Sequence, residues 1–252
     1  METSRLSDAL GHAPADKRIE ILRGIARSGS ISQAAREAGV SYKAAWQAID
    51  TLTNLTGVAL VERVVGGAGG GGALLTVQGH ELLALAEAHD AARTAVQRRW
   101  QTRQGGAGSA AARLALRTSM RNQLLAHILR LDVCDNLVRV RMRIGESGVI
   151  TAKITRESAE LLGLCEAMEV VVLCKATAVR VDRPGRLRGA KTNLFAAAVS
   201  SVTRGGGGDE IALALAPDLR LAGFAPAGSM LRARQRVEAR VDESAVVIAL
   251  PG

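Results

Sequence analysis

Five side chains between residues 119 and 175 are of the types that bind a small, multiply charged oxyanion. Ser119 and Arg121 lie two residues apart in TSMRNQLLAHI. Thr155 and Ser158 lie three residues apart in ITRESAELLGL, and Lys175 lies in LCKATAV. Arginine offers a planar cationic fork, lysine a compact cation, and each hydroxyl a hydrogen-bond donor. A tetrahedral dianion could accept a bond from each, and charge-assisted bonds contribute roughly 1.5–3 kcal/mol apiece.

The segment after Thr155 adds a second source of positive potential. Its pattern is helical with Thr155 as the N-cap, so free N–H groups and the helix dipole favour an anion there. A plainer interpretation is that Arg121 and Lys175 are solvated strand ends and that Thr155 only caps a helix. Because the three segments are far apart in the sequence, spacing alone leaves both interpretations open.

The segments that carry these side chains are predicted to be β-strands. Between residues 138 and 144, four apolar residues alternate with three arginines, which is the period of a half-buried strand. VITAKIT and EVVVLCKATAVRV are rich in Val and Ile. By contrast, residues 16–103 have helical periodicity, and the small residues of 104–117 predict a flexible linker. The chain is therefore predicted to be an α+β multidomain protein, helical first and β second.

The β half is predicted to contain an internal duplication. EVVVLCKATAVRV resembles RVEARVDESAVVIAL, and TSMRNQLLAHIL resembles GAKTNLFAAAVS. The offset is 71 residues between Asn122 and Asn193 and 67 between Val179 and Val246. A nearly constant offset indicates two copies that differ by small insertions or deletions, although short Val-rich strands can also resemble one another by chance. The two copies are predicted to span residues 118–182 and 188–252.

Two short helices are predicted between residues 29 and 52. Ser30 and Gln33 have the spacing of a capping box at the start of the first helix. Gly39 suits the positive φ that ends a helix, and Ser41 can cap the next one. Two short helices with a glycine turn and small residues at their crossing predict a helix-turn-helix. The second helix is expected to bury an apolar stripe of Tyr42, Ala45, Trp46, Ile49 and Leu52.

The opposite face of the second helix is predicted to be exposed. Lys43 can bind a phosphate or a guanine, and the amide of Gln47 suits an adenine edge. The alternative is an ordinary helical hairpin with a solvated polar face. The residues expected on this outward face are Ser41, Lys43, Ala44, Gln47 and Asp50.

A β-hairpin is predicted after the two helices. VALVER and ALLTVQGHELL are strand-like, the glycine-rich tip from Gly66 to Gly72 joins them, and a helix begins near Thr76. The whole stretch resembles the winged helix-turn-helix of LysR-type regulators, with Ile31 and Val61 in place of the usual aromatic residues. The matching residues are Gly29-Ser30, Ala34-Ala35, Val40-Ser41, Leu52, Gly57, Leu60, Arg63, Leu75-Thr76 and Gly79.

The resemblance implies a DNA-binding and dimerisation domain over residues 16–103. In the resembled family the long helix after the wing pairs two subunits, so that two recognition helices meet two half-sites of the DNA. The DNA contacts it implies are Ser41, Tyr42, Lys43, Ala44, Gln47 and Arg63.

The three motifs of the first β copy resemble the molybdate-binding Mop (TOBE) module, a small OB-like β-barrel. They agree with it in order and spacing over residues 118–181, with Met120 for the usual alanine. The resemblance implies that molybdate, or tungstate, is the ligand, and that sites form between modules of different subunits. It implies no direct protein–metal ligand. The molybdate contacts it implies are Ser119, Arg121, Thr155, Ser158, Lys175 and the backbone of Ala176.

The second β copy departs from this pattern. Lys191-Thr192-Asn193 stands where Met120-Arg121-Asn122 does, so the arginine is absent. Asp242-Glu243 stands where Lys175-Ala176 does, and two acidic residues would repel a dianion. The second copy is therefore predicted to be degenerate, and either architectural or lining a shared site.

The composition narrows the class of protein further. The net charge of +9 favours polyanionic partners, although arginine on a solvated surface gives the same balance. Cys134, Cys165 and Cys174 lie in apolar runs and are predicted to be core residues rather than zinc ligands or disulfides. The start METSRLSDAL has no apolar run and no stretch reaches 18 apolar residues, so no signal peptide or membrane span is expected, and the expected location is the cytoplasm. No catalytic constellation is recognisable in the sequence, so an enzyme is not predicted.

A winged helix-turn-helix followed by two Mop modules resembles the ModE-type molybdate-dependent transcriptional regulators. The resemblance implies a homodimer that binds a palindromic double-stranded operator and represses molybdate-uptake genes when the oxyanion is bound. The alternative is a molybdenum storage or buffering protein, because free-standing Mop modules have this role. Such a protein would not need Lys43, Gln47 or the wing.

Overall fold

The computed structural model contains two compact units. The first comprises residues 1–112 and 156–164, and the second residues 113–155 and 165–252. The predicted linker, residues 104–117, lies outside the described residues. The structure describes residues 17–64, 72–101, 118–146, 148–186, 192–217 and 219–250.

The first unit is built on three helices that cross one another. Their apolar faces form one core, to which α2 contributes Ile21 and Ile25, and α4 contributes Ala45, Ala48 and Ile49. This packing fixes which face of α4 is exposed. The helices are α2 (Lys17–Ser28), α3 (Ile31–Glu37) and α4 (Tyr42–Thr56).

The predicted caps of α3 and α4 are confirmed. The Ser30 hydroxyl accepts a hydrogen bond from the Gln33 amide, and the Ser41 hydroxyl accepts one from the Ala44 amide. Gly39, in the turn between the two helices, has a φ of 65°, a conformation that costs little only for glycine. The helix-turn-helix is therefore specified locally, by residues within a few positions of each helix end.

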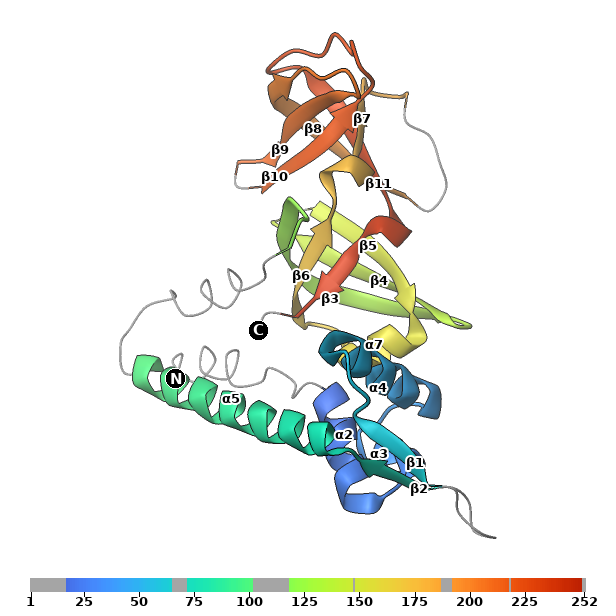
Figure 1. The fold of residues 1–252 in the computed structure, drawn as a ribbon. Helices are drawn as coiled ribbons and strands as arrows, with labels where there is room; N and C mark the ends of the chain where they lie inside the picture. Colours follow the sequence, from blue (N-terminus) through green and yellow to red (C-terminus); the bar gives the residue numbers. More distant parts are fainter. Residues whose placement is uncertain are drawn as a thin grey trace. The chain divides into compact units, whose positions relative to one another are not determined.

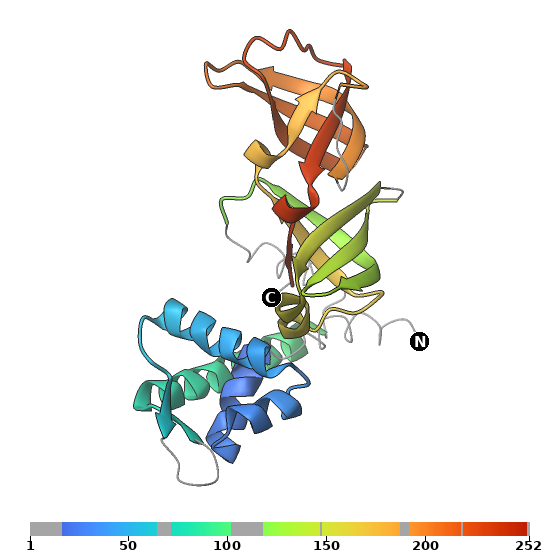
Figure 2. The same ribbon diagram turned by 90° about the vertical axis from the view of Figure 1, so that its right-hand side faces the viewer.

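An antiparallel hairpin and a long helix follow these three helices in the first unit (Figure 2). β1 (Val61–Val64) pairs with β2 (Gly72–Leu75), and α5 (Val77–Gln101) follows directly. The strands and the helix start near Thr76 are confirmed. The glycine-rich tip between the strands, residues 65–71, lies outside the described residues.

Thr76 and Gly79 fix the start of α5 against the strand β1. The Thr76 amide donates to the Leu60 carbonyl at 3.0 Å, and its hydroxyl accepts from the Gly79 amide at 3.0 Å. A Cβ atom on Gly79 would lie 2.4 Å from the Leu60 carbonyl oxygen. The Leu-Thr and Gly of the LysR-type pattern therefore have a steric and hydrogen-bonding reason in this chain.

The second unit consists of two β modules (Figure 1). The first copy forms β3 (Asn122–Cys134), β4 (Leu137–Ile144), β5 (Gly148–Thr155), β6 (Glu169–Cys174), η1 (Ala176–Ala178) and β7 (Arg180–Asp182). The second copy forms β8 (Thr192–Thr203), β9 (Asp209–Ala216), β10 (Leu219–Ala225), β11 (Arg236–Asp242), η2 (Glu243–Ala245) and β12 (Val247–Ala249). α7 (Arg156–Leu162) follows β5 in sequence and belongs to the first unit.

The two modules exchange their last strands. One sheet has the order β12-β6-β3-β4-β5, and the other is a closed barrel of β10-β7-β11-β8-β9. Strand β12, from the second copy, lies beside β6 of the first, while β7 pairs with β11 (Figure 1). The copies therefore cannot separate without opening both sheets. The α+β multidomain class, helix-turn-helix first and β modules second, is confirmed.

The strand registers confirm the duplication. Ile128 pairs with Met142 in the first copy, and Val199 with Leu213 in the second, 71 residues later in each case. A register shift follows immediately after Ile128 and after Val199. Matching irregularities at matching positions are not expected from chance similarity of Val-rich strands.

A left-handed residue crosses the bulge in both copies. Ala167 has a φ of 65° and donates its amide to the Ile128 carbonyl. Arg234 has a φ of 66° and donates to the Val199 carbonyl. These residues are 67 positions apart, which is the offset that the sequence shows for the second half of each copy.

The prediction that all three cysteines are core residues is wrong for two of them. Cys174 is buried, which raises the pKa of its thiol, but Cys134 and Cys165 are exposed. Cys134 ends β3, where alternating burial stops before the turn at Asp135, and Cys165 follows α7. Within the described residues, no helix is both long and apolar enough to cross a membrane.

Candidate functional site

The recognition helix α4 exposes polar groups at its N-terminal end. Ser41, Lys43 and Gln47 are exposed, as the sequence predicted. Tyr42 is 54% exposed and makes an edge-to-face contact with Trp46, with ring centroids 6.3 Å apart. Hydroxyl, ammonium and amide groups therefore lie on one face, where they can meet phosphates and base edges in a major groove.

Two predictions about the faces of α4 are wrong. Ala44, expected on the outward face, is fully buried, and Tyr42, expected in the apolar stripe, is largely exposed. Ala44 and Ala48 are one helical turn apart and both are buried in the core. The buried face of α4 is therefore wider than the predicted apolar stripe. Ala44 can therefore contribute no side-chain contact to DNA unless the unit rearranges.

Helix α7 contacts the N-terminal end of α4 within the first unit. The Lys43 ammonium lies 2.7 Å from a Glu157 carboxylate oxygen, and the Ser41 amide donates to Glu160 at 3.0 Å. Partial burial raises the pKa of Glu160, but the Ser41 bonds and the Arg156 ion pair outweigh it and lower the pKa. The carboxylates of Glu157 and Glu160 thus bind the Lys43 ammonium and the Ser41 amide, which would otherwise be available to DNA phosphates.

Arg63, the remaining predicted DNA contact, lies in β1 of the wing. Its backbone is opposite Ala73 in the antiparallel register. The wing therefore places Arg63 one residue from the end of β1, next to the glycine-rich tip.

The register of the first β module brings Arg121 and Lys175 together. Asn122 of β3 is opposite Cys174 of β6, so the residues just outside this pair, Arg121 and Lys175, lie at the same end of the sheet. Ser119 lies two residues before Arg121, and Ala176 opens η1 directly after Lys175. Ser119, Arg121 and Lys175 are exposed, whereas Ala176 is buried.

The same register places Thr155 at the opposite end of the sheet. Thr155 of β5 is opposite Leu137, which is opposite Cys134 at the far end of β3. β3 has 13 residues, which span up to about 40 Å when extended. Ser158 lies three residues further along the chain, in α7. One chain therefore gathers the two cations and one hydroxyl at one sheet end, and the Thr155 segment at the other.

Arg121 has an internal partner. Its guanidinium forms an ion pair with the carboxylate of Glu210 from β9, and both side chains are partly exposed, at 59% and 32%. Sequence analysis did not single out Glu210, because nothing local to Arg121 signals a partner 89 residues away. The pair holds the guanidinium at the sheet end where Lys175 lies.

Two asparagines connect the β copies reciprocally. The Asn122 side chain donates to the Ala222 carbonyl at 2.9 Å and accepts from the Ala222 amide at 2.7 Å. Asn193 makes the same two bonds to Thr151, at 2.9 and 2.7 Å. Both asparagines are buried. The signal for them was present in the sequence, since they occupy the same place in both copies.

In the second copy, the acidic residues Asp242 and Glu243 stand where the first copy has Lys175 and Ala176. Glu243 binds an arginine of the first copy. Arg139 donates to Glu243 through two nitrogens, at 2.8 and 2.5 Å, and the Glu243 side chain is only 5% exposed. This carboxylate raises the pKa of Arg139. The hydroxyl and amide of Ser244 lower the pKa of its neighbour Asp242. Asp242 therefore stays charged at neutral pH.

Comparison with known proteins decides the family. Residues 17–80 match the bacterial regulatory helix-turn-helix family described as lysR, and residues 118–181 match the TOBE domain. The transcriptional regulator ModE of Yersinia pestis is 35% identical over 206 residues, covering 79% of this chain and 77% of its own. The DNA-binding transcriptional dual regulator ModE of Escherichia coli (strain K12) is 34% identical over 243 residues, covering 92% of each chain.

The chain belongs to the ModE family of transcriptional regulators. The prediction of a DNA-binding transcriptional regulator is therefore confirmed. A solved structure of the cytoplasmic molybdate-binding protein ModG, in a form with molybdate bound, is similar with a TM-score of 0.51. The match covers 54% of this chain and 100% of ModG at 23% identity, so it supports the β fold alone.

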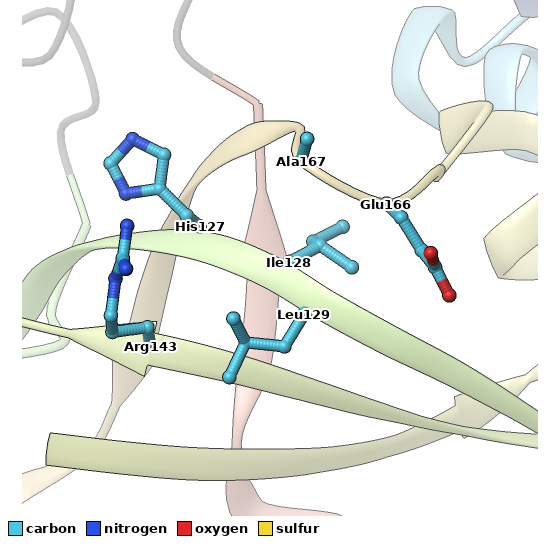
Figure 3. A pocket seen from close by; sticks show the side chains of 6 residues that line it. All are labelled: His127, Ile128, Leu129, Arg143, Glu166 and Ala167. Carbon is cyan, nitrogen blue, oxygen red and sulfur yellow. The ribbon is translucent and has the colours of Figure 1, made fainter.

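A shallow depression elsewhere on the second unit is lined by residues other than the predicted molybdate contacts. The depression has a volume of about 320 Å³. Figure 3 shows His127 and Arg143 on one side of it and Glu166 on the other. Ile128, Leu129 and Ala167 complete its wall. None of the six residues predicted to contact molybdate lines this depression, which offers Arg143 as a control for the site at Arg121.

Proposed function

We propose that this protein binds molybdate, or tungstate, and that the bound oxyanion controls its binding to double-stranded operator DNA. The observation that carries the proposal is the pairing of two exposed cations, Arg121 and Lys175, at one sheet end of a chain that also exposes Lys43 and Gln47 on a recognition helix. One part of the chain suits a small anion and the other an anionic polymer.

The proposed oxyanion site uses donors that need no transferable proton. A guanidinium and an ammonium supply two positive charges, which suit a tetrahedral dianion such as molybdate. No catalytic carboxylate or hydroxyl is required, because the protein binds the anion without changing it chemically. The proposed contacts are Ser119, Arg121, Thr155, Ser158, Lys175 and the backbone of Ala176.

We infer that a second copy of the chain completes the site. Arg121 and Thr155 lie at opposite ends of the first module's sheet, so one module cannot place both on the same small anion. A homodimer in which the Thr155 segment of one subunit meets the Arg121 end of the other removes this difficulty. The 25-residue helix α5 is the element proposed to pair the subunits, in agreement with a palindromic operator.

The proposed regulatory outcome is repression of molybdate-uptake genes in the cytoplasm when the oxyanion is bound. The anion can favour one dimer geometry over another, and only such a difference in affinity couples it to DNA binding. Helix α7 supports a route for this coupling, because it carries Ser158 and also contacts Lys43 of the recognition helix.

The anion site is tested by calorimetric titration of sodium molybdate into the purified full chain and three variants. Arg121→Ala and Lys175→Ala are expected to weaken binding at least tenfold each, since each removes a charge-assisted contact of roughly 1.5–3 kcal/mol. Arg143→Ala removes an exposed arginine outside the proposed site and should bind normally. Normal binding by both Arg121→Ala and Lys175→Ala, or loss of binding in Arg143→Ala alone, contradicts the proposed site.

A further inference from the structure

The ion pairs Arg121–Glu210 and Arg139–Glu243 occupy related positions in the two β copies. Arg139 of β4 is opposite Lys153, and Glu210 of β9 is opposite Phe224, 71 residues later in both strands. Glu210 is therefore the second-copy counterpart of Arg139. Glu243 likewise takes the place of Ala176 by the offset of 67 that relates β6 to β11.

Each of these two ion pairs therefore joins a guanidinium from one β copy to a carboxylate from the other copy. At the first, the cation comes from the first copy and the carboxylate from the second. At the other, Arg139 of the first copy is bound by Glu243 of the second. The two positions differ in whether the carboxylate is exposed.

We propose that Glu210 is a resident carboxylate that occupies Arg121 until an oxyanion displaces it, and that it thereby sets the affinity of the site. The inference rests on the proposed function, because it concerns the same site. A guanidinium presents five N–H donors in a fixed plane, and a carboxylate and a tetrahedral oxyanion compete for the same edge of it.

The exposure of the Arg121 pair makes exchange feasible. Both side chains are partly in water, so the pair is worth at most a small free energy and the carboxylate can turn away. Glu210 then still lies near the bound dianion and repels it. To displace the Glu210 carboxylate from Arg121, the ligand must carry enough negative charge and enough oxygen atoms. This requirement favours a tetrahedral dianion over a monoanion.

By the same reasoning, an oxyanion cannot readily displace Glu243 from Arg139. Glu243 is nearly fully buried and receives two bonds from Arg139, so displacing it would leave a buried carboxylate without its partner. This position is occupied permanently by a protein carboxylate. The duplicated fold accordingly has one exchangeable position and one that is filled by its own side chain.

The test compares Glu210→Gln with Glu146→Gln by titrating sodium molybdate into the full chain at fixed ionic strength. Glu146 is an exposed residue in the turn after β4, so its substitution changes the net charge equally. Glu210→Gln is expected to bind molybdate about fivefold more tightly, corresponding to ~1 kcal/mol, while Glu146→Gln matches the unchanged protein.

Each outcome decides the matter. Unchanged or weaker molybdate binding by Glu210→Gln, with normal binding by the unchanged protein, overturns the role of Glu210 and leaves the proposed function intact. Equal tightening by both variants assigns the effect to net charge and also overturns it. Failure of the unchanged protein to bind molybdate overturns the proposed function, and this inference with it. Circular dichroism spectra of the three proteins verify that the compared molecules are folded.

Discussion

Replacing Asn122 or Asn193 by alanine removes one of the two clamps that connect the β copies. Each asparagine makes two bonds, of 2.9 and 2.7 Å, to the carbonyl and the amide of a single residue in the other copy. The residues left behind are Ala222 in one case and Thr151 in the other. Because the clamps are related by the duplication, both substitutions should have similar costs.

The expected cost follows from the groups that lose their partners. A buried donor or acceptor left unpaired costs about 1–3 kcal/mol, and each substitution affects one of each. The asparagines are buried, but Ala222 and Thr151 are only half-buried, so water can reach their backbone and the lower end of the range applies. We therefore expect each substitution to lower the free energy of unfolding by about 2 kcal/mol.

Urea unfolding followed by two signals separates the units. Both tryptophans, Trp46 and Trp100, belong to the first unit, so their fluorescence reports on that unit, while circular dichroism of β structure reports on the second. The asparagine substitutions should lower the urea midpoint of the transition detected by circular dichroism. They should leave the midpoint of the fluorescence-detected transition unchanged. Gln123→Ala, at an exposed neighbouring position, should change stability by less than about 0.5 kcal/mol. A cost below that value for either asparagine, or a cost in only one of them, would refute the clamp.

Three further predictions follow from individual contacts. Hydrogen bonds from Ser229 lower the pKa of Asp209 to about 2, so its stabilising effect is fully present above about pH 4 and is lost as the pH falls towards 2; urea titrations at several pH values should find Asp209→Asn less stable at pH 7 and equal to the unchanged protein near pH 2. Gly79→Ala should cost about 2 kcal/mol or more in the tryptophan-detected transition, because its Cβ would collide with a backbone carbonyl; a cost near zero would contradict the close approach. Glu157→Gln should raise the affinity for a labelled DNA duplex about two- to fivefold without molybdate, because it frees Lys43; unchanged fluorescence anisotropy titrations would show that the contact does not limit DNA binding.

Local signals in the sequence predicted the first unit well. Ser30, Gly39 and Ser41 act on backbone groups within four residues, so their roles can be inferred without knowing the tertiary structure. Ala44 was predicted wrongly because an alanine is compatible with either face of a helix. Its burial depends on how α4 packs against its neighbours, which the pattern of one helix does not determine.

The candidate oxyanion site depended on strand register, which is a long-range property. The sequence supplied the residue types, but only the pairing of β3 with β6 brings Arg121 beside Lys175. The same pairing pattern moves Thr155 to the other end of the sheet, which the chain order did not indicate. Glu210 was missed for the same reason, because it reaches Arg121 from the other copy of the duplication.

The most direct test of the account measures DNA binding as a function of molybdate concentration. A labelled duplex from upstream of molybdate-transport genes is titrated with the full chain, and with Arg121→Ala as the site variant, at fixed salt because phosphate contacts are strongly salt-dependent. We predict that molybdate tightens binding of the unchanged protein at least fivefold and has no effect on Arg121→Ala. Equal DNA affinity with and without molybdate in the unchanged protein, or an equal molybdate response in the variant, would contradict the claim that an oxyanion held at Arg121 controls the recognition helix.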